Sequence, residues 1–172
     1  MVEQGRVRTR PTGLGKFSVL ERVHRGDVLL LSEQKEYDRL KERLHKLCAA
    51  AEEASTGILF DAEETWIQGP LDDLLQEMMA HYNKEKAIVY NTYQLYATSR
   101  LGKLKEDYER AQKEGYLLGA KLVRGAYMEK ERERAEEMGY PSPIHADKDG
   151  VDKDFNAALD YCMDRFDKGM AF

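Results

Sequence analysis

Three carboxylates follow one of the short apolar runs of the chain. Asp61, Glu63 and Glu64 come directly after residues 57–60. Such a cluster can act as a base, orient a basic partner or hold a divalent cation. It is equally typical of a helix N-terminus, where the helix dipole stabilises acidic side chains, and that interpretation is favoured for Glu63 and Glu64. Because Asp61 follows the apolar run without a break, we expect its side chain to point into a site.

A second apolar run, residues 117–123, ends among cations. It carries Lys121 and continues into Arg124, with an aromatic side chain three residues later at Tyr127. A buried cation without a partner is costly, so at least one of these basic side chains should meet an anionic ligand or an acid such as Asp61.

Polar side chains also follow a third apolar run, residues 87–90. Asn91, Thr92 and Gln94 offer amides and a hydroxyl there, which suit the polar edge of a planar ring. Each of these motifs alone is also typical of a purely structural role. Together they describe a pocket with a fixed acid, two cations, an amide and an aromatic wall.

The elements that must position these residues alternate between short apolar runs and longer segments of helical period. Strands are predicted at residues 57–60, 87–90 and 117–123, and a weaker one at residues 7–12. Pro70 is compatible only with the first turn of its helix. The predicted helices run from an N-cap at Ser32 to near Gly57, from Ile67 to Met79, from Leu101 to Ala111, around residues 129–134 and around residues 152–167.

The steps between strand ends have the length of one βα unit. Asp61 and Gln94 are 33 residues apart, and Gln94 and Arg124 are 30 residues apart. Such units form either an open doubly wound sheet or a closed (βα)8 barrel, and both keep their chemistry at the carboxyl ends of the strands. No Gly-x-Gly-x-x-Gly follows a strand, so the dinucleotide-binding open sheet loses support and a barrel is favoured.

The composition of the chain disfavours nucleic-acid-binding, membrane-spanning and metal-binding proteins. The 172 residues carry a formal net charge of −5, which disfavours nucleic acid as the main partner. The chain has no run of about 20 apolar residues and its start lacks a secretory signal, so a cytoplasmic protein is expected. Cys48 and Cys162 stand in helical patterns and are expected to be buried thiols, and the four scattered histidines predict no metal site.

At the same residues the sequence resembles the proline dehydrogenase family. The resemblance extends over nearly the whole chain, and the run 121–127 followed by Gly-Tyr-Pro is its most specific part. The matching segments are Arg10-Pro11-Thr12-Gly13, Leu59-Phe60-Asp61-Ala62-Glu63-Glu64, Tyr93-Gln94, Lys121-Leu122-Val123-Arg124-Gly125-Ala126-Tyr127 and Gly139-Tyr140-Pro141-Ser142-Pro143-Ile144.

The resemblance implies an α/β fold of the TIM-like (βα)8 type and an FAD-dependent oxidoreductase. Such enzymes oxidise L-proline to Δ1-pyrroline-5-carboxylate by hydride transfer to FAD and pass the electrons to a quinone. A position at the surface of the inner membrane is therefore an alternative to a purely cytoplasmic one.

The resemblance also implies roles for individual residues. Asp61 would hold Lys121 near the flavin, and these two are the implied catalytic residues. Arg10, where relatives carry a lysine, would meet the substrate carboxylate, and Tyr127 would pack on the proline ring. The implied cofactor-binding residues are Ala62, Gln94, Lys121, Val123, Gly125 and Lys148. Many relatives instead have Arg at 121 and Lys at 124, and a Thr at 151 where this chain has Val151.

By the family pattern, residues 1–172 are a single incomplete barrel domain with about four of eight βα units. An open half barrel leaves exposed edges, so the chain alone is expected to self-associate, to bind FAD weakly or not at all, and not to turn over proline. Two alternatives stay open: a divalent-cation-dependent barrel lyase using Asp61, Glu63 and Glu64, and a half-barrel module or fragment without catalysis.

Overall fold

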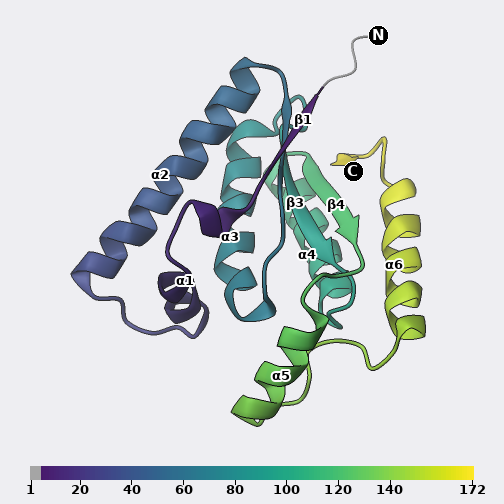
Figure 1. The fold of residues 1–172 in the computed structure, drawn as a ribbon. Coiled ribbons are helices and arrows are strands. Elements are labelled where there is room, and N and C mark those ends of the chain that lie inside the picture. The colour runs from purple at the N-terminus through teal and green to yellow at the C-terminus, as the bar shows by residue number, and fades with distance from the viewer. Residues whose placement is uncertain (1–4) are drawn as a thin grey trace.

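Five parallel strands lie side by side in the order in which they occur along the chain (Figure 1). This computed structural model describes residues 5–172. Because all four neighbouring pairs are parallel, the carboxyl ends of the strands gather at one edge of the sheet. The strands are β1 (Arg6–Thr9), β2 (Gly57–Phe60), β3 (Val89–Gln94), β4 (Leu118–Val123) and β5 (Met170–Ala171).

Helices connect the strands, as the predicted βα units require. A 3₁₀ helix (Pro11–Gly13) precedes α1 (Phe17–His24), α2 (Leu31–Glu53), α3 (Thr65–Tyr82), α4 (Arg100–Glu114), α5 (Met128–Met138) and α6 (Lys148–Met163). In Figure 1, α3 and α4 lie behind the strands with α2 and α6 on either side, while α5 projects beyond the end of β4. The fold is therefore a sheet with one helix-covered face.

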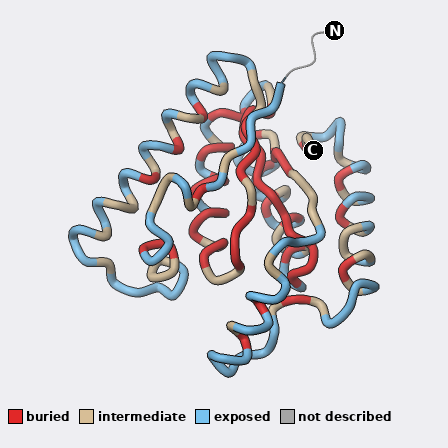
Figure 2. The backbone as a smooth tube through the Cα atoms, in the orientation of Figure 1, coloured by how far each residue is buried: buried red, intermediate tan, exposed pale blue. Residues whose placement is uncertain are grey.

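Buried side chains gather between the sheet and the helices (Figure 2). Phe60 of β2 belongs to this core together with Leu40 of α2 and Leu71 of α3, and all three are almost completely buried. Since successive strand residues point to opposite faces, Leu59 lies on the other side of the sheet, in register with Tyr90. The sheet thus has a large core on its helical face and a small cluster on its open face.

Two predictions about the strands are wrong. The predicted strand 87–90 begins later and is longer, because the Asn83 carboxamide binds both the N–H and the C=O of Val89 and fixes the strand start there. β3 then continues to Gln94, which is part of the strand and does not follow it. Four strands were expected, whereas residues 5–172 form five, because β5 pairs with Leu118 and Gly119. β5 was missed because its two residues are too few to show the periodicity of a strand.

One helix was missed, and two predictions about the helices need correction. α1 was not predicted, because its eight residues hold only two buried apolar side chains. Ser32 is not an N-cap, because α2 begins at Leu31 and its N-cap residue is Leu30. The Leu30 N–H donates to the Glu33 carboxylate at 2.7 Å. Pro70 is the sixth residue of α3 and not in its first turn, because the helix begins at Thr65.

The two cysteines are buried free thiols, as predicted. Burial raises the pKa of Cys48 to about 12 and that of Cys162 to about 11, so both thiols are protonated at neutral pH. Across residues 5–172, no helix is both long and apolar enough to span a bilayer.

Candidate active site

Asp61 and Lys121 meet at the carboxyl edge of the sheet. Lys121 Nζ lies 2.6 Å from Asp61 Oδ1, and Arg8 donates to the other carboxylate oxygen at 2.9 Å. Burial alone would oppose ionisation of Asp61, but the hydrogen bonds from Lys121 and Arg8 outweigh it and lower the pKa of this carboxyl below its ordinary 3.8. The sequence thus correctly indicated that these two groups meet.

The pair lies in a cavity of 230 Å³. Four cations line it, and Asp61 is the carboxylate among its lining residues, so the cavity is electropositive and favours anionic groups. Every predicted site residue except Lys148 lines this cavity. The lining residues are Arg8, Arg10, Asp61, Ala62, Thr92, Gln94, Lys121, Val123, Arg124, Gly125, Ala126 and Tyr127.

The Gln94 amide is held by the main chain. Its Nε2 donates to the Glu63 carbonyl at 2.8 Å and its Oε1 accepts from the Ala126 N–H at 3.0 Å. The side chain is 5% exposed. Because a carboxamide carries two N–H groups, an oriented Gln94 keeps one donor for a ligand.

The loop after β4 rests on Tyr96. Gly125 has φ of +147°, and a Cβ at that position would lie 2.3 Å from the Tyr96 ring. The Tyr96 N–H also donates to the Arg124 carbonyl at 2.6 Å. Only glycine fits here, so the close approach of loop and ring fixes the main chain that borders the cavity.

Lys148 lies away from the cavity. Its ammonium pairs with Asp152, which in turn accepts from Arg124 Nε at 2.6 Å. Asp152 therefore links Lys148 to Arg124, which lines the cavity. Val151 is buried in one cluster with Tyr96 and so packs in the interior.

Glu63 and Glu64 stand at the N-terminus of α3, as the favoured interpretation of these acids predicted: Glu64 is the N-cap residue, although its side chain forms no capping hydrogen bond. Glu63 accepts hydrogen bonds from the hydroxyls of Thr12 and Tyr127, and Glu64 pairs with Lys130 at 3.0 Å. The N-terminus of α3 is capped from α5.

That cap comes from Glu131, which accepts from the Thr65 N–H at 2.8 Å and from the Thr65 hydroxyl at 2.6 Å. Glu131 is completely buried. Asp61, Glu63 and Glu64, the three carboxylates that follow β2, thus face different donors. Within residues 5–172, no group of three Asp, Glu, His or Cys side chains is arranged to hold a metal ion.

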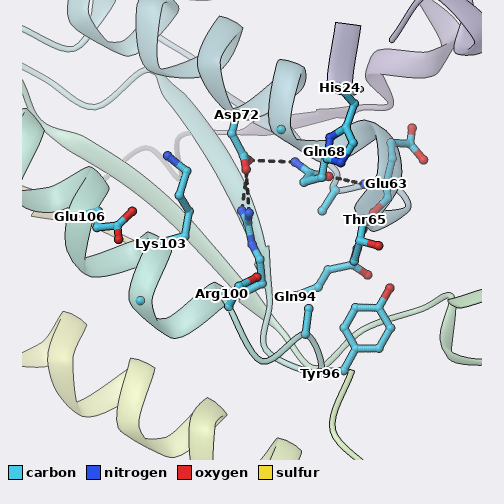
Figure 3. Close-up of a pocket in the computed structure, with 15 residues that line it drawn as sticks. His24, Glu63, Thr65, Gln68, Asp72, Gln94, Tyr96, Arg100, Lys103 and Glu106 are labelled. Atoms are coloured by element: carbon cyan, nitrogen blue, oxygen red, sulfur yellow. Dashed lines mark hydrogen bonds and ion pairs between the residues drawn. The ribbon is translucent and has the colours of Figure 1, made fainter. Parts of the chain in front are cut away.

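A second cavity of 510 Å³ lies between the N-terminal halves of α3 and α4 (Figure 3). It shares Ala62 and Gln94 with the first cavity. Asp72 and Arg100 form a two-pronged ion pair in its wall, with nitrogen–oxygen distances of 2.6 and 3.1 Å. Gln68 and Asn91 also donate to Asp72, so this carboxylate is fully engaged in joining α3 to β3 and α4.

Comparison with known proteins identifies the family. Residues 5–171 match the sequence model described as proline dehydrogenase. The chain belongs to the proline dehydrogenase family. This confirms the resemblance on which the roles of the site residues were predicted, while those roles themselves stay predictions.

Several curated relatives are similar over most of this chain. Proline dehydrogenase 1, mitochondrial, of Drosophila melanogaster is 38% identical over 77% of the chain and 20% of the relative. The human protein of the same name is 36% identical over 77% of the chain and 22% of its own length. The carbapenem antibiotics biosynthesis protein CarD of Pectobacterium carotovorum is 32% identical over 92% of the chain and 41% of its own length. The chain thus spans about a fifth of the mitochondrial relatives.

Solved structures share the fold. Proline utilization A from Bdellovibrio bacteriovorus, inactivated by N-propargylglycine, superposes with a TM-score of 0.80 at 22% identity, covering 95% of this chain and 16% of that protein. Proline utilization A from Corynebacterium freiburgense gives a TM-score of 0.75 at 22% identity, covering 91% of this chain and 16% of that protein. The predicted α/β arrangement of parallel βα units is confirmed.

Proposed function

We propose that this chain takes part in the oxidation of L-proline to Δ1-pyrroline-5-carboxylate, with FAD as hydride acceptor and a quinone as the final electron acceptor. Bound FAD would supply the flavin ring that accepts the hydride from carbon 5 of proline. The observation that carries the proposal is the Asp61–Lys121 ion pair inside an electropositive cavity, in a chain of the proline dehydrogenase family.

The residues around the cavity fit a flavin. Lys121 offers a fixed ammonium group, and positive charge beside a flavin stabilises its electron-rich reduced form. Gln94 offers an oriented N–H, and Val123 and Gly125 border the cavity with their main chain. We propose that these residues and Ala62 hold the ring. Lys148 and Arg124 would lie toward the phosphates.

The same cavity suits the substrate. Arg10 lines it and can bind the proline carboxylate in a two-pronged manner, while Tyr127 provides an apolar wall for the ring. Neighbouring cations disfavour the charged form of an amine, so this environment favours neutral proline, the form that can lose a hydride. Orientation of the ring supplies much of the rate.

The sheet of residues 5–172 has open edges at β1 and β5. Open edges pair readily with other chains. We therefore propose that the 172-residue chain alone self-associates, binds FAD weakly and does not turn over proline. The binding test must detect weak complexes.

Flavin binding is tested by titrating FAD into the 15N-labelled chain and following amide shifts by NMR. Shifts concentrated at Gln94, Val123 and Gly125 support the proposal. The amide of Gly102 in the second cavity is the internal control. Equal shifts at both cavities, or shifts elsewhere alone, contradict the assignment of the FAD site.

Turnover is tested by co-expressing the chain with a segment of a family member that carries further strands of the barrel. The measurement is bleaching of the oxidised flavin spectrum when L-proline is added without oxygen. An assembled, flavin-loaded complex that proline fails to reduce would overturn the proposed activity.

A further inference from the structure

Glu63 is a buried carboxylate with hydroxyl partners. It is 4% exposed, and its two oxygens accept from Thr12 Oγ1 at 2.5 Å and from the Tyr127 hydroxyl at 3.0 Å. Thr12 follows β1 and Tyr127 follows β4. One acidic side chain from the end of β2 therefore connects the carboxyl ends of three strands.

The main chain of Glu63 is fixed as well. Its N–H donates to Gln68 Oε1 at 2.7 Å, and its carbonyl accepts from Gln94 Nε2 at 2.8 Å. Both glutamine side chains are buried. The main chain of Glu63 thus contacts Gln94, which is proposed to meet the flavin. Its side chain contacts Tyr127, which is proposed to meet proline.

Tyr127 needs such support because it is only half-buried. It directly follows residues 124–126, which are exposed. Lys130 lies over the Tyr127 ring at 5.4 Å, but its own side chain is 61% exposed and holds the ring weakly. The hydrogen bond to buried Glu63 is therefore the firm contact of this ring.

We propose that Glu63 is a positioning residue that fixes Tyr127 as the aromatic wall of the substrate site. This inference rests on the proposed function. Loss of the carboxylate frees the Tyr127 ring, and a free ring packs less well against proline. Because Glu63 touches neither the cavity's cations nor the reacting atoms, its removal should weaken substrate binding more than the chemical step.

The charges around Tyr127 agree with a hydroxyl that stays a donor. Burial first, and then the charge and hydrogen bond of Glu63, raise the pKa of Tyr127 to about 12, with Glu64 adding to this and Arg10 opposing it. The hydroxyl is therefore protonated over the whole range in which the enzyme would be assayed.

The first test follows the Tyr127 ring by NMR in the FAD-free chain, with ring signals assigned by their loss in Tyr127→Phe. Glu63→Ala removes the acceptor of the Tyr127 hydroxyl, so the ring should become free to move and its signals should average. Glu63→Gln keeps an acceptor and should retain the signals of a fixed ring. Glu64→Gln is the matched control, since Glu64 pairs with Lys130.

The second test measures proline oxidation by the flavin-loaded complex that the chain forms with the co-expressed segment carrying further barrel strands. Glu63→Ala and Tyr127→Phe should each raise KM for proline about tenfold with little change in kcat, the scale expected for a hydrogen bond to a charged group. The double variant should be no worse than either single one, and Glu63→Gln should restore most of the affinity.

Unchanged ring signals in Glu63→Ala, or fully additive KM effects, would overturn the positioning role. If Glu63→Ala fails to fold, Glu63→Asp, which withdraws the carboxylate by one methylene, replaces it in both tests. Failure of the assembled, flavin-loaded wild-type complex to oxidise proline contradicts the proposed function instead, and the ring signals then decide the role of Glu63 on their own.

Discussion

Lys121 and Asp61 pair across an intervening strand. Their atoms are 2.6 Å apart although β3 separates β2 from β4, and Thr92 of β3 lies in register with Lys121 between them. The Thr92 hydroxyl donates to the Phe60 carbonyl at 2.7 Å, so the Thr92 side chain is bound to β2 and does not take part in the ion pair. The ion pair can therefore form only when the carboxyl ends of β2, β3 and β4 are aligned.

Asp61→Asn should lower the affinity for FAD by about tenfold, because the neutral amide no longer fixes the half-buried Lys121 ammonium. The dissociation constant is measured by NMR titration of the chain. Glu114→Gln, which breaks an exposed pair with Arg110, is the control and should leave affinity unchanged. Equal affinities of Asp61→Asn and wild type would remove Lys121 from the flavin site.

The lowered pKa of Asp61 predicts a pH dependence of stability. Since the folded-state pKa lies below 3.8, ionised Asp61 stabilises the fold above that pH, and this contribution is lost as pH falls through the folded-state value. The difference in unfolding free energy between wild type and Asp61→Asn should therefore be constant from pH 7 to about 5 and shrink below pH 3.8. Urea unfolding over this range measures it, and a pH-independent difference would contradict the ion pair.

Asp72→Ala should destabilise the fold by about 3–5 kcal/mol, because it leaves the Arg100 guanidinium buried without its acid. Glu77→Ala on the same helix breaks an exposed pair with Lys41 and should cost less than about 1 kcal/mol. Both values come from denaturant unfolding. A similar cost for the two variants would show that water reaches Arg100.

Gly125→Ala should destabilise the loop by at least about 1–3 kcal/mol, because its φ is strained for a side chain and its Cβ would meet Tyr96. The loss of unfolding free energy caused by Gly125→Ala should be smaller in a Tyr96→Ala background, where the ring is absent. Gly102→Ala is the control: it lies inside α4, its Cβ meets nothing, and it should stabilise by about 0.5–1 kcal/mol. Thermal unfolding compares these variants with wild type and with Tyr96→Ala. Equal cost of Gly125→Ala in both backgrounds would rule out the contact.

Much of the fold and of the main site could be predicted from the sequence. Parallel βα units bring strand ends to one edge whatever the loop details, so Asp61 and Lys121 could be placed together from their positions after and within apolar runs. Local periodicity also indicated α3 and α4, but it could not locate β5, which has two residues.

The support around the site could not be predicted. Glu63 and Tyr127 are 64 residues apart, and Glu131 reaches Thr65 across 66. These contacts depend on the angle at which α5 leaves β4, and no local pattern reports that angle. Tyr96 was missed for a similar reason, since its role is visible only through the positive φ of Gly125.

The cap that Glu131 places on α3 joins two helices into one cooperative unit. When α5 detaches, the Thr65 N–H loses its acceptor at the same moment. Amide hydrogens of the first turn of α3 and of α5 should consequently exchange with solvent at matched rates, although the two segments are separated by two strands in the chain. A slow, shared opening of this kind would also loosen the Tyr127 side of the first cavity, because Tyr127 directly precedes α5.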